Sequence, residues 1–438
     1  MLIAHGVGSR GDLPLPVWMF VWGAAIALFV SFAALGTLWK SPRLATLASG
    51  RTFNIGPAAT KALVLTGRLI MLALFVMSVI AGLFGADDDG VSVVPVAFYV
   101  VAWVGAQVLS GIAGNVWHVV NPVVTIARGV EWLRARLGRA STGGRTAAPT
   151  WLGMWPAALG LMVFLCLELA HPSRSSPRLL GWVLLTHAAV SLALAARWGV
   201  AWLVEHEPFG ALLDMLAAMA PIRFDADGIT LRAPMAGLAT MPVVSGTAAT
   251  LLIVLGGTTF DGFSESELGR SMLGRPTGWS GSIVLLLGII VSIAVVTLLF
   301  AAGTAWIARK TATPWQTTAN DFTPTLVPIV LGYAIAHYAQ LLIDESQTFI
   351  IRLSDPGGQG WDLFGGAGAS ADLTLVSPTT IAWIQVVAIL AGHIGGITMA
   401  HDRSVERYRG ANAFTTQAVM LIVMVLYSTL GLWLLLNA

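Results

Sequence analysis

The chain of 438 residues is 56% hydrophobic and only 11% charged, with a formal net charge of +2. Soluble globular proteins contain about 25% charged residues, so this composition excludes a water-soluble globular domain and indicates an integral membrane protein whose main partner is the lipid bilayer. The small net charge argues against a nucleic-acid partner, and the single cysteine, Cys166, excludes a disulfide framework.

Long apolar runs follow one another along the chain. A helical crossing of a hydrocarbon layer about 30 Å thick needs roughly 20 apolar residues, because every backbone N–H and C=O must be satisfied within the segment. We therefore predict an all-α integral membrane bundle of about ten transmembrane helices, formed as a single domain over residues 1–438. The predicted spans are 15–39, 62–85, 91–114, 151–171, 179–204, 238–257, 282–309, 322–343, 379–401 and 413–435.

The sixth run gives the weakest signal. Pro234 and Pro242 interrupt its start, and Gly246, Gly256 and Gly257 lower its hydrophobicity. Without this span every downstream segment would change its orientation, so the prediction of ten depends on it.

Charges in the connections predict the orientation, because loops rich in Lys and Arg stay in the cytoplasm. The first connection is basic, whereas the second contains three Asp and no base. Continuing the alternation puts every strongly basic connection on one side, with the residues Lys40, Arg43, Arg51, Lys61, Arg128, Arg134, Arg136, Arg139, Arg145, Arg309, Lys310, Arg403, Arg407 and Arg409. We therefore predict a multi-pass protein of the bacterial cytoplasmic (inner) membrane, N-out and C-out.

Three connections differ from simple turns. Residues 115–122 contain two Asn and a Pro that break the helix after the third span; we expect an interfacial amphipathic helix to follow, and a cavity-lining turn is the alternative. On the predicted inner side, residues 205–233 include an expected interfacial helix at 209–219. On the outer side, residues 344–377 are rich in Gly and Asp, which is typical of a turn-rich loop.

Three histidines are predicted to lie within the bundle: His187, His337 and His393. At a rise of 1.5 Å per residue, the first two lie roughly 10 to 12 Å below the outer surface and could share a site, whereas His393 lies deeper. Imidazole binds Zn, Cu and haem iron and carries protons near neutral pH. We therefore predict a divalent metal (Zn or Cu) or haem at these histidines. No HExxH motif occurs, and the alternative is a histidine hydrogen-bonded to a neighbouring helix.

Acidic residues gather at the outer ends of the predicted spans. Asp261, Asp344 and Glu345 lie there with Glu168, and His337 is predicted nearby. Such a cluster can activate a water molecule or bind a cation. We predict His337, Asp261, Asp344 and Glu345 as catalytic residues; the alternative is that the acids are solvated helix ends.

Five groups of residues carry a resemblance to a known family. They are Ala4-His5-Gly6 with Asp12-Leu13-Pro14, residues 115–122, Phe260-Asp261-Gly262-Phe263, residues 322–329 with His337-Tyr338, and residues 392–403. On these motifs, and over nearly its whole length, the chain resembles bacterial polytopic membrane proteins labelled fenitrothion hydrolase. The resemblance implies hydrolysis of an organophosphate triester and does not define which residues act.

The same resemblance concerns the start of the chain. In that family the His-Gly dipeptide follows a secretory signal, whose removal would make the histidine amino-terminal. The resemblance therefore implies His5 as a copper ligand, because an amino-terminal histidine offers both its α-amine and its imidazole. Only four residues precede His5 in this sequence, too few for a signal peptide, so either the true start lies upstream or His5 has no such role.

Two classes of function follow. The first is a membrane-embedded, metal-assisted hydrolase of phosphoric triesters with an outward-facing site. The second is a transporter or permease, or a copper- or haem-binding membrane protein, in which the same residues bind an ion or small-molecule substrate and His393 relays protons. Gly392, Gly395 and Gly396 predict close helix packing, within the bundle or against a partner membrane subunit.

Overall fold

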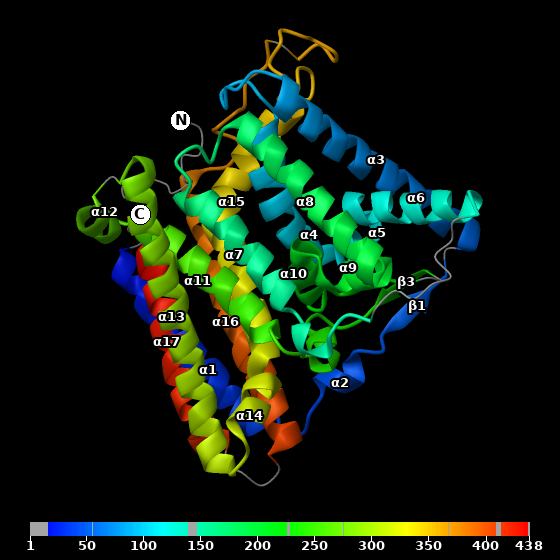
Figure 1. Ribbon diagram of the computed structural model, residues 1–438. Coiled ribbons are helices and arrows are strands. Elements are labelled where there is room, and N and C mark those ends of the chain that lie inside the picture. Colours follow the sequence, from blue (N-terminus) through cyan, green and yellow to red (C-terminus); the bar gives the residue numbers. More distant parts are fainter. Residues whose placement is uncertain are drawn as a thin grey trace.

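The computed structural model describes residues 16–54, 56–138, 147–225, 228–274, 276–366, 368–408 and 413–436. These residues form a bundle of long helices with a small amount of sheet (Figure 1). Eight helical segments of the described chain are long and apolar enough to cross a membrane. This confirms the prediction of an all-α bundle with several helices able to cross a membrane.

The eight segments account for most of the bundle. They are α1 (Val17–Leu38), α3 (Pro57–Phe84), η2 (Val96–Gly105) continued by α4 (Ala106–Ala113), α8 (Pro177–Trp198), α13 (Gly278–Thr311), α14 (Trp315–Phe322) continued through η5 (Thr323–Thr325) by α15 (Leu326–Arg352), α16 (Pro378–Arg407) and α17 (Ala413–Leu436). Two further helices overlap predicted spans. They are α7 (Trp155–Ala170), with 16 residues, and α11 (Thr247–Glu265), with 19 residues.

Helix α11 begins at Thr247 rather than at residue 238, where the sixth predicted span begins. The residues before it form only a short 3-10 helix, η4 (Ala236–Thr240). Gly246 then adopts a left-handed conformation, with φ of +87°, which ends any helix that approaches from the N-terminal side. A Cβ on Gly246 would come within 2.7 Å of the Trp155 nitrogen, so glycine also permits the close approach of α11 to α7.

Contacts at one end of the bundle join three helices. The Ala86 amide donates to the Gly357 carbonyl (2.8 Å), and Ser176 Oγ donates to Asp87 Oδ1 (2.7 Å). The end of α3 therefore meets the start of α8 and the loop that follows α15. We call this the acidic end, because residues 87–89 are all Asp.

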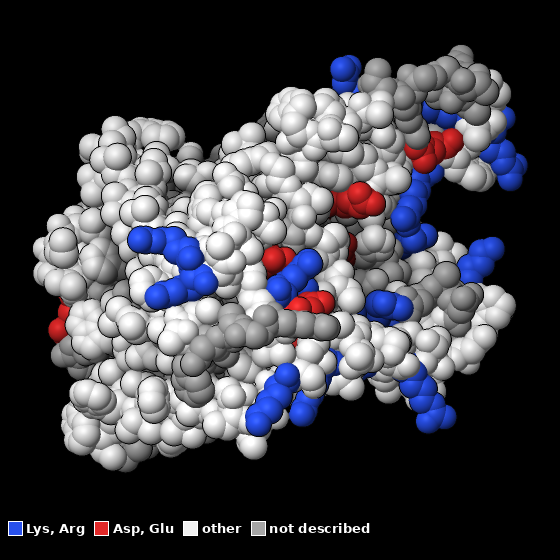
Figure 2. Space-filling view, turned by 90° about the horizontal axis from the view of Figure 1, so that it is seen from below, with Lys and Arg blue, Asp and Glu red and all other residues white. Residues whose placement is uncertain are grey.

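The opposite end is basic. There Trp39 Nε1 donates to Asp402 Oδ1 (2.8 Å), which joins the end of α1 to the end of α16. Trp306 Nε1 donates to the Thr415 carbonyl (3.0 Å), which joins the end of α13 to the start of α17. Figure 2, viewed from below, shows Lys and Arg side chains spread over this part of the surface. Of the predicted inner basic residues, Arg139, Arg145 and Arg409 lie outside the described residues.

Short elements connect the long helices. Helix α12 (Glu267–Leu273) follows α11 at the acidic end, and the others are α2 (Leu44–Leu47), α5 (Val116–Val120), α6 (Pro122–Arg136), η3 (Thr150–Leu152), α9 (Val200–His206) and α10 (Pro208–Ala217). Three strands, β1 (Arg51–Phe53), β2 (Ile222–Asp225) and β3 (Gly228–Leu231), form an antiparallel sheet in the order β1-β3-β2. Thr52 pairs with Thr230 in this sheet, and the sequence does not predict any sheet.

The predicted helix at 209–219 corresponds to α10, which is mostly buried against neighbouring helices. Leu212, Leu213 and Leu216 are buried, and the helix packs against α4 and α7. An aromatic cluster joins these elements: the Phe164 ring lies 4.5 Å from Trp103 and 5.3 Å from Phe209, measured between ring centroids. Burial of such rings stabilises the centre of the protein.

Glycines bring α15 and α16 close together. A Cβ on Gly332 would come within 2.6 Å of the Ala388 carbonyl, and one on Gly392 within 2.6 Å of the Pro328 carbonyl. Backbones can approach this closely only where side chains are absent. The close packing predicted at Gly392 therefore occurs within the bundle.

The first helix packs against the last two. Phe20 and Ala24 of α1 belong to one buried cluster with Val386 and Ile389 of α16 and Leu432 of α17. This cluster closes one side of the bundle with residues from both ends of the chain.

Candidate functional site

Two helices bring an acid, a histidine and a tyrosine together inside the protein. Asp261 of α11 and His337 of α15 are joined by a contact of 2.8 Å between Oδ2 and Nε2. Tyr338, the next residue of α15, donates its hydroxyl to the same Oδ2 at 3.1 Å. All three residues are buried. Of the four predicted catalytic residues, the structure therefore brings Asp261 and His337 into direct contact.

These contacts suit an ionised Asp261. An ionised carboxylate only accepts hydrogen bonds, so the His337 contact requires the imidazole proton on Nε2. Two donors aimed at one oxygen hold the carboxylate in a defined orientation, and its second oxygen takes no part in these two contacts. Gly262, the residue after Asp261, lies along the imidazole, since a Cβ there would be 3.8 Å from His337 Nδ1.

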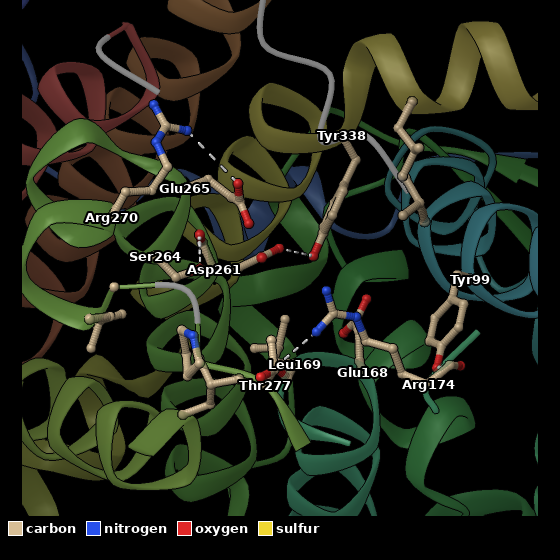
Figure 3. A pocket seen from close by; sticks show the side chains of 16 residues that line it. Tyr99, Glu168, Leu169, Arg174, Asp261, Ser264, Glu265, Arg270, Thr277 and Tyr338 are labelled. Atoms are coloured by element: carbon tan, nitrogen blue, oxygen red, sulfur yellow. Dashed lines mark hydrogen bonds and ion pairs between the residues drawn. The ribbon is translucent and has the colours of Figure 1, made fainter. Parts of the chain in front are cut away.

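Asp261 lines a cavity of about 550 Å³ near the acidic end (Figure 3). This volume is in the range of sites for small organic molecules. His337, which contacts Asp261, is not among the residues that line the cavity. The lining residues are Tyr99, Val104, Glu168, Leu169, Arg174, Asp261, Ser264, Glu265, Arg270, Leu273, Gly274, Pro276, Thr277, Leu285, Tyr338 and Leu341.

A second carboxyl group, Glu168 of α7, lines the same cavity. Its Oε2 atom is buried and has no hydrogen-bond partner among the described residues. Arg174, in the loop that follows α7, lies beside it (Figure 3) and donates to the Leu169 carbonyl at 3.4 Å. The hydroxyl of Tyr99 donates to the Arg174 carbonyl at 2.9 Å and holds this loop against η2. The two carboxyl groups therefore have unlike surroundings, because Asp261 has two donors and Glu168 Oε2 has none.

The rim of the cavity is formed by the end of α11 and by α12. Ser264 Oγ donates to the Asp261 carbonyl (3.0 Å), and Glu265 faces Arg270 across 4.0 Å (Figure 3). Ser266 Oγ accepts from the Gly269 amide (3.1 Å) and caps α12. Charged side chains from the end of α11 and from α12 therefore line one part of the cavity, and apolar side chains line another part.

The other two predicted catalytic acids lie elsewhere on α15. Asp344 and Glu345 do not line the cavity of Asp261. Glu345 lines a separate small cavity of about 20 Å³ with Asp89 and Arg352. Arg352 donates to the Asp89 carbonyl (2.9 Å) and holds the loop after α3 against the end of α15.

His187, predicted at the level of His337, faces a different partner. Its Nε2 lies 3.1 Å from Oε1 of Glu207, the residue that caps α10. Glu207 also accepts from Asn121 Nδ2 (3.0 Å) and from the Gly210 amide (2.7 Å). The imidazole of His187 is therefore engaged with the start of α10, away from Asp261.

A third histidine–acid pair lies beside this network. His118 Nδ1 lies 3.0 Å from Asp214 Oδ2, so α5 is joined to α10. The hydrogen bond to Asp214 raises the pKa of His118 above its usual value, and partial burial opposes this rise.

The remaining predicted metal ligands are also separate. His393 is buried in α16, and its Nδ1 donates to the Ile389 carbonyl at 2.9 Å. His5 lies outside the described residues. Within the described ranges, no group of three or more His, Cys, Asp or Glu side chains is arranged to hold a metal ion.

Several residues of the cavity are not predicted from the sequence. Glu168 belongs to the predicted outer acids but not to the predicted catalytic set, and Tyr99, Arg174 and Tyr338 are not predicted as site residues. Tyr338 directly follows His337 in one of the motifs that carry the resemblance, which is a signal that could have included it. No protein-family model matches this chain, and comparison with curated proteins and with solved structures finds no match.

Proposed function

We propose that the chain crosses a bacterial cytoplasmic (inner) membrane ten times, with both ends outside. The contacts at the acidic end and those at the basic end support this topology, because each set joins helix ends that are predicted to lie on the same side of the membrane. Helices α7 and α11 supply the fourth and sixth crossings in addition to the eight long segments. D88C/C166S and R407C/C166S variants test it in intact cells with an impermeant maleimide. Residue 88 should react directly and residue 407 only after permeabilisation; the reverse pattern would contradict the topology.

For the cavity, we propose hydrolysis of a neutral triester, such as an aryl dialkyl phosphate or phosphorothioate. The observation that carries this proposal is the pair of carboxyl groups with unlike surroundings that line one cavity, Asp261 and Glu168. Two carboxyl groups held in different protonation states can act as base and acid at the same pH. The resemblance to proteins labelled fenitrothion hydrolase agrees with this reaction class.

Each group has a defined role in the proposed reaction. Ionised Asp261, oriented by His337 and Tyr338, accepts a proton from water as the water oxygen attacks phosphorus. The bond from phosphorus to the aryl oxygen breaks, and protonated Glu168 gives its proton to the leaving phenolate. Arg174 stabilises the charge on the non-bridging oxygen or sulfur. A proton then returns from Asp261 to Glu168 through water, which restores both groups. Net, one water and one triester become a diester acid and a phenol.

Release of a nitrophenol from an aryl triester tests the proposal, with the full chain purified in detergent and its bound Zn, Cu and Fe measured in the same sample. General acid–base groups contribute on the order of 100-fold or more in rate. D261N and E168Q should therefore each lower kcat by at least roughly 100-fold. The matched control, E267Q on the exposed part of α12, should keep full activity. Equal rates in all four proteins would contradict the assigned roles.

A permease is the second candidate, favoured by one observation: Glu168 Oε2 is a buried carboxyl oxygen without a partner among the described residues, next to a second carboxyl group. Ionisable groups in membrane helices often bind transported ions. Liposomes that contain a pH-sensitive dye distinguish the two. Wild-type protein that hydrolyses no triester, but moves protons in a manner lost in E168Q, would favour transport.

A further inference from the structure

Helix α3 stands apart from the core and leaves a groove beside it. Only 6% of the apolar stretch of α3 is buried. Between α3 and the helix formed by η2 and α4 lies an apolar space of about 780 Å³, which α15 and α5 also line. Its walls include Ile70, Leu74, Phe98, Leu109, Trp117 and Phe349.

The groove continues into a basic space at the start of α3. This second space, of about 740 Å³, is lined by Lys61, Arg68 and Arg128. Both spaces share Gly67, Val116 and Val120 as lining residues, so they are parts of one feature. We call the whole the lateral groove.

No described acid lines the basic space, and Lys61, Arg68 and Arg128 form no ion pair with any acid in the part of the chain that the structure describes. His118, which also lines this space, is paired with Asp214 at 3.0 Å. Arg68 donates through Nε to the Val119 carbonyl (2.9 Å), which leaves both terminal amino groups of its guanidinium for a ligand. Arg128 lines the same space as Arg68, so two guanidinium groups face one cavity. Two like charges facing one space are stabilised when an anion lies between them.

We propose that the lateral groove binds one anionic phospholipid, with an acyl chain in the apolar space and its phosphate at Lys61, Arg68 and Arg128. An apolar trough open toward lipid suits the chain, and guanidinium groups bind phosphate through parallel hydrogen bonds. A zwitterionic head group would bring its own cation to this cluster and bind less well. The lipid would fill the space between α3 and the helix formed by η2 and α4, where α3 has few protein contacts of its own. The inference does not depend on the chemistry of the cavity at Asp261.

Quenching of Trp117 by brominated lipid tests the proposal in the full chain. Trp117 lines the apolar space, and bromine atoms on an acyl chain quench an indole that they contact. The probes are brominated phosphatidylglycerol and brominated phosphatidylcholine, titrated into protein in detergent. Subtracting the W117F signal isolates Trp117 from the other tryptophans. Phosphatidylglycerol should quench this component at much lower concentration than phosphatidylcholine.

Variants of the basic space complete the test. Each basic group near an anionic lipid contributes roughly fivefold in affinity, so K61Q/R128Q should weaken phosphatidylglycerol binding by roughly 30-fold. The single variant K61Q should weaken it by roughly fivefold and, because Lys61 is exposed, should leave the fold unchanged. The control R309Q/K310Q removes the same charge from the end of α13 and should bind like wild type.

Three results would overturn the inference. The first is equal quenching of Trp117 by the two lipids, which would mean ordinary contact with the surrounding bilayer. The second is identical quenching of wild type and W117F, which would mean that the lipid does not contact Trp117. The third is phosphatidylglycerol binding by K61Q and K61Q/R128Q that equals that of R309Q/K310Q.

Discussion

Removal of the Glu207 carboxylate should destabilise the protein more than any surface change. Glu207 is 1% exposed in its side chain and accepts from the Gly210 amide (2.7 Å), the Phe209 amide (3.1 Å) and Asn121 Nδ2 (3.0 Å). His187 Nε2 lies 3.1 Å away. The carboxylate therefore caps α10 and ties it to α6 and α8 at once.

The expected loss can be worked out from these contacts. Each buried donor left without a partner costs about 1–3 kcal/mol, and an N-cap contributes about 1 kcal/mol. The His187 side chain is 25% exposed, so water can replace part of its contact. We expect E207A to lower the free energy of unfolding by about 4 kcal/mol, in the range for breaking a buried pair by removing one partner. E207Q keeps one acceptor oxygen and should lose about half as much.

Unfolding of the full chain in mixed micelles of increasing SDS fraction, followed by tryptophan fluorescence, measures this loss. E205Q is the matched control, because Glu205 is two residues away and exposed. Its transition should coincide with that of wild type. A transition of E207A within error of E205Q would refute the conclusion that Glu207 organises the start of α10.

Three further predictions use the same unfolding measurement. Asp214 raises the pKa of His118, so the stabilisation from this pair should be complete below about pH 6.5 and should decrease as the pH rises through the raised pKa. The difference in the free energy of unfolding between wild type and H118Q should therefore shrink from pH 5.5 to 8.5. A growing difference would contradict the pairing. G114A should cost more than 1 kcal/mol, since Gly114 has φ of +88° and a Cβ there would meet the carbonyl of the first β2 residue at 2.1 Å, whereas G23A, with open space around it, should be neutral. D402A should cost about 2–3 kcal/mol and make the loop before α2 sensitive to protease, because Asp402 accepts from the Trp39 indole (2.8 Å) and from the Arg43 amide (2.7 Å); unchanged cleavage would contradict this role.

The helices are readable from sequence because hydrocarbon selects apolar runs, but hydropathy marks the lipid layer and not the ends of helices. The eighth predicted span ends at residue 343, where polar residues begin, whereas α15 continues to Arg352. Asp344 and Glu345 are therefore helical residues that project beyond the apolar stretch. At α11 the helix is shorter than the apolar run. The run begins at residue 238, but the left-handed conformation of Gly246 delays the start of the helix to Thr247.

The site was only partly predictable for a related reason. Counting residues along a helix gives depth but not the direction in which a side chain points. His187 and His337 are predicted at one depth, yet His187 contacts Glu207 and His337 contacts Asp261. The Asp261–His337 pair joins residues 76 positions apart, and its formation depends on how α11 and α15 are rotated against each other. The sheet is unpredicted for the same reason: β1 pairs with β3, which is far away in the sequence, and strands of three or four residues carry too little pattern to indicate such a pairing.

The packing of α1 against α16 and α17 affects how the protein is made. Helix α1 leaves the ribosome before α16 and α17, and the surfaces that bury Phe20 and Ala24 are synthesised more than 300 residues later. Until then its apolar face must be covered by lipid or by the insertion machinery. Strand β1 likewise cannot form its backbone hydrogen bonds until β3 has been synthesised. Truncated chains that lack α17 should therefore insert α1 normally but leave it exposed to degradation, so that quality control can detect an incomplete molecule through the unburied face of α1.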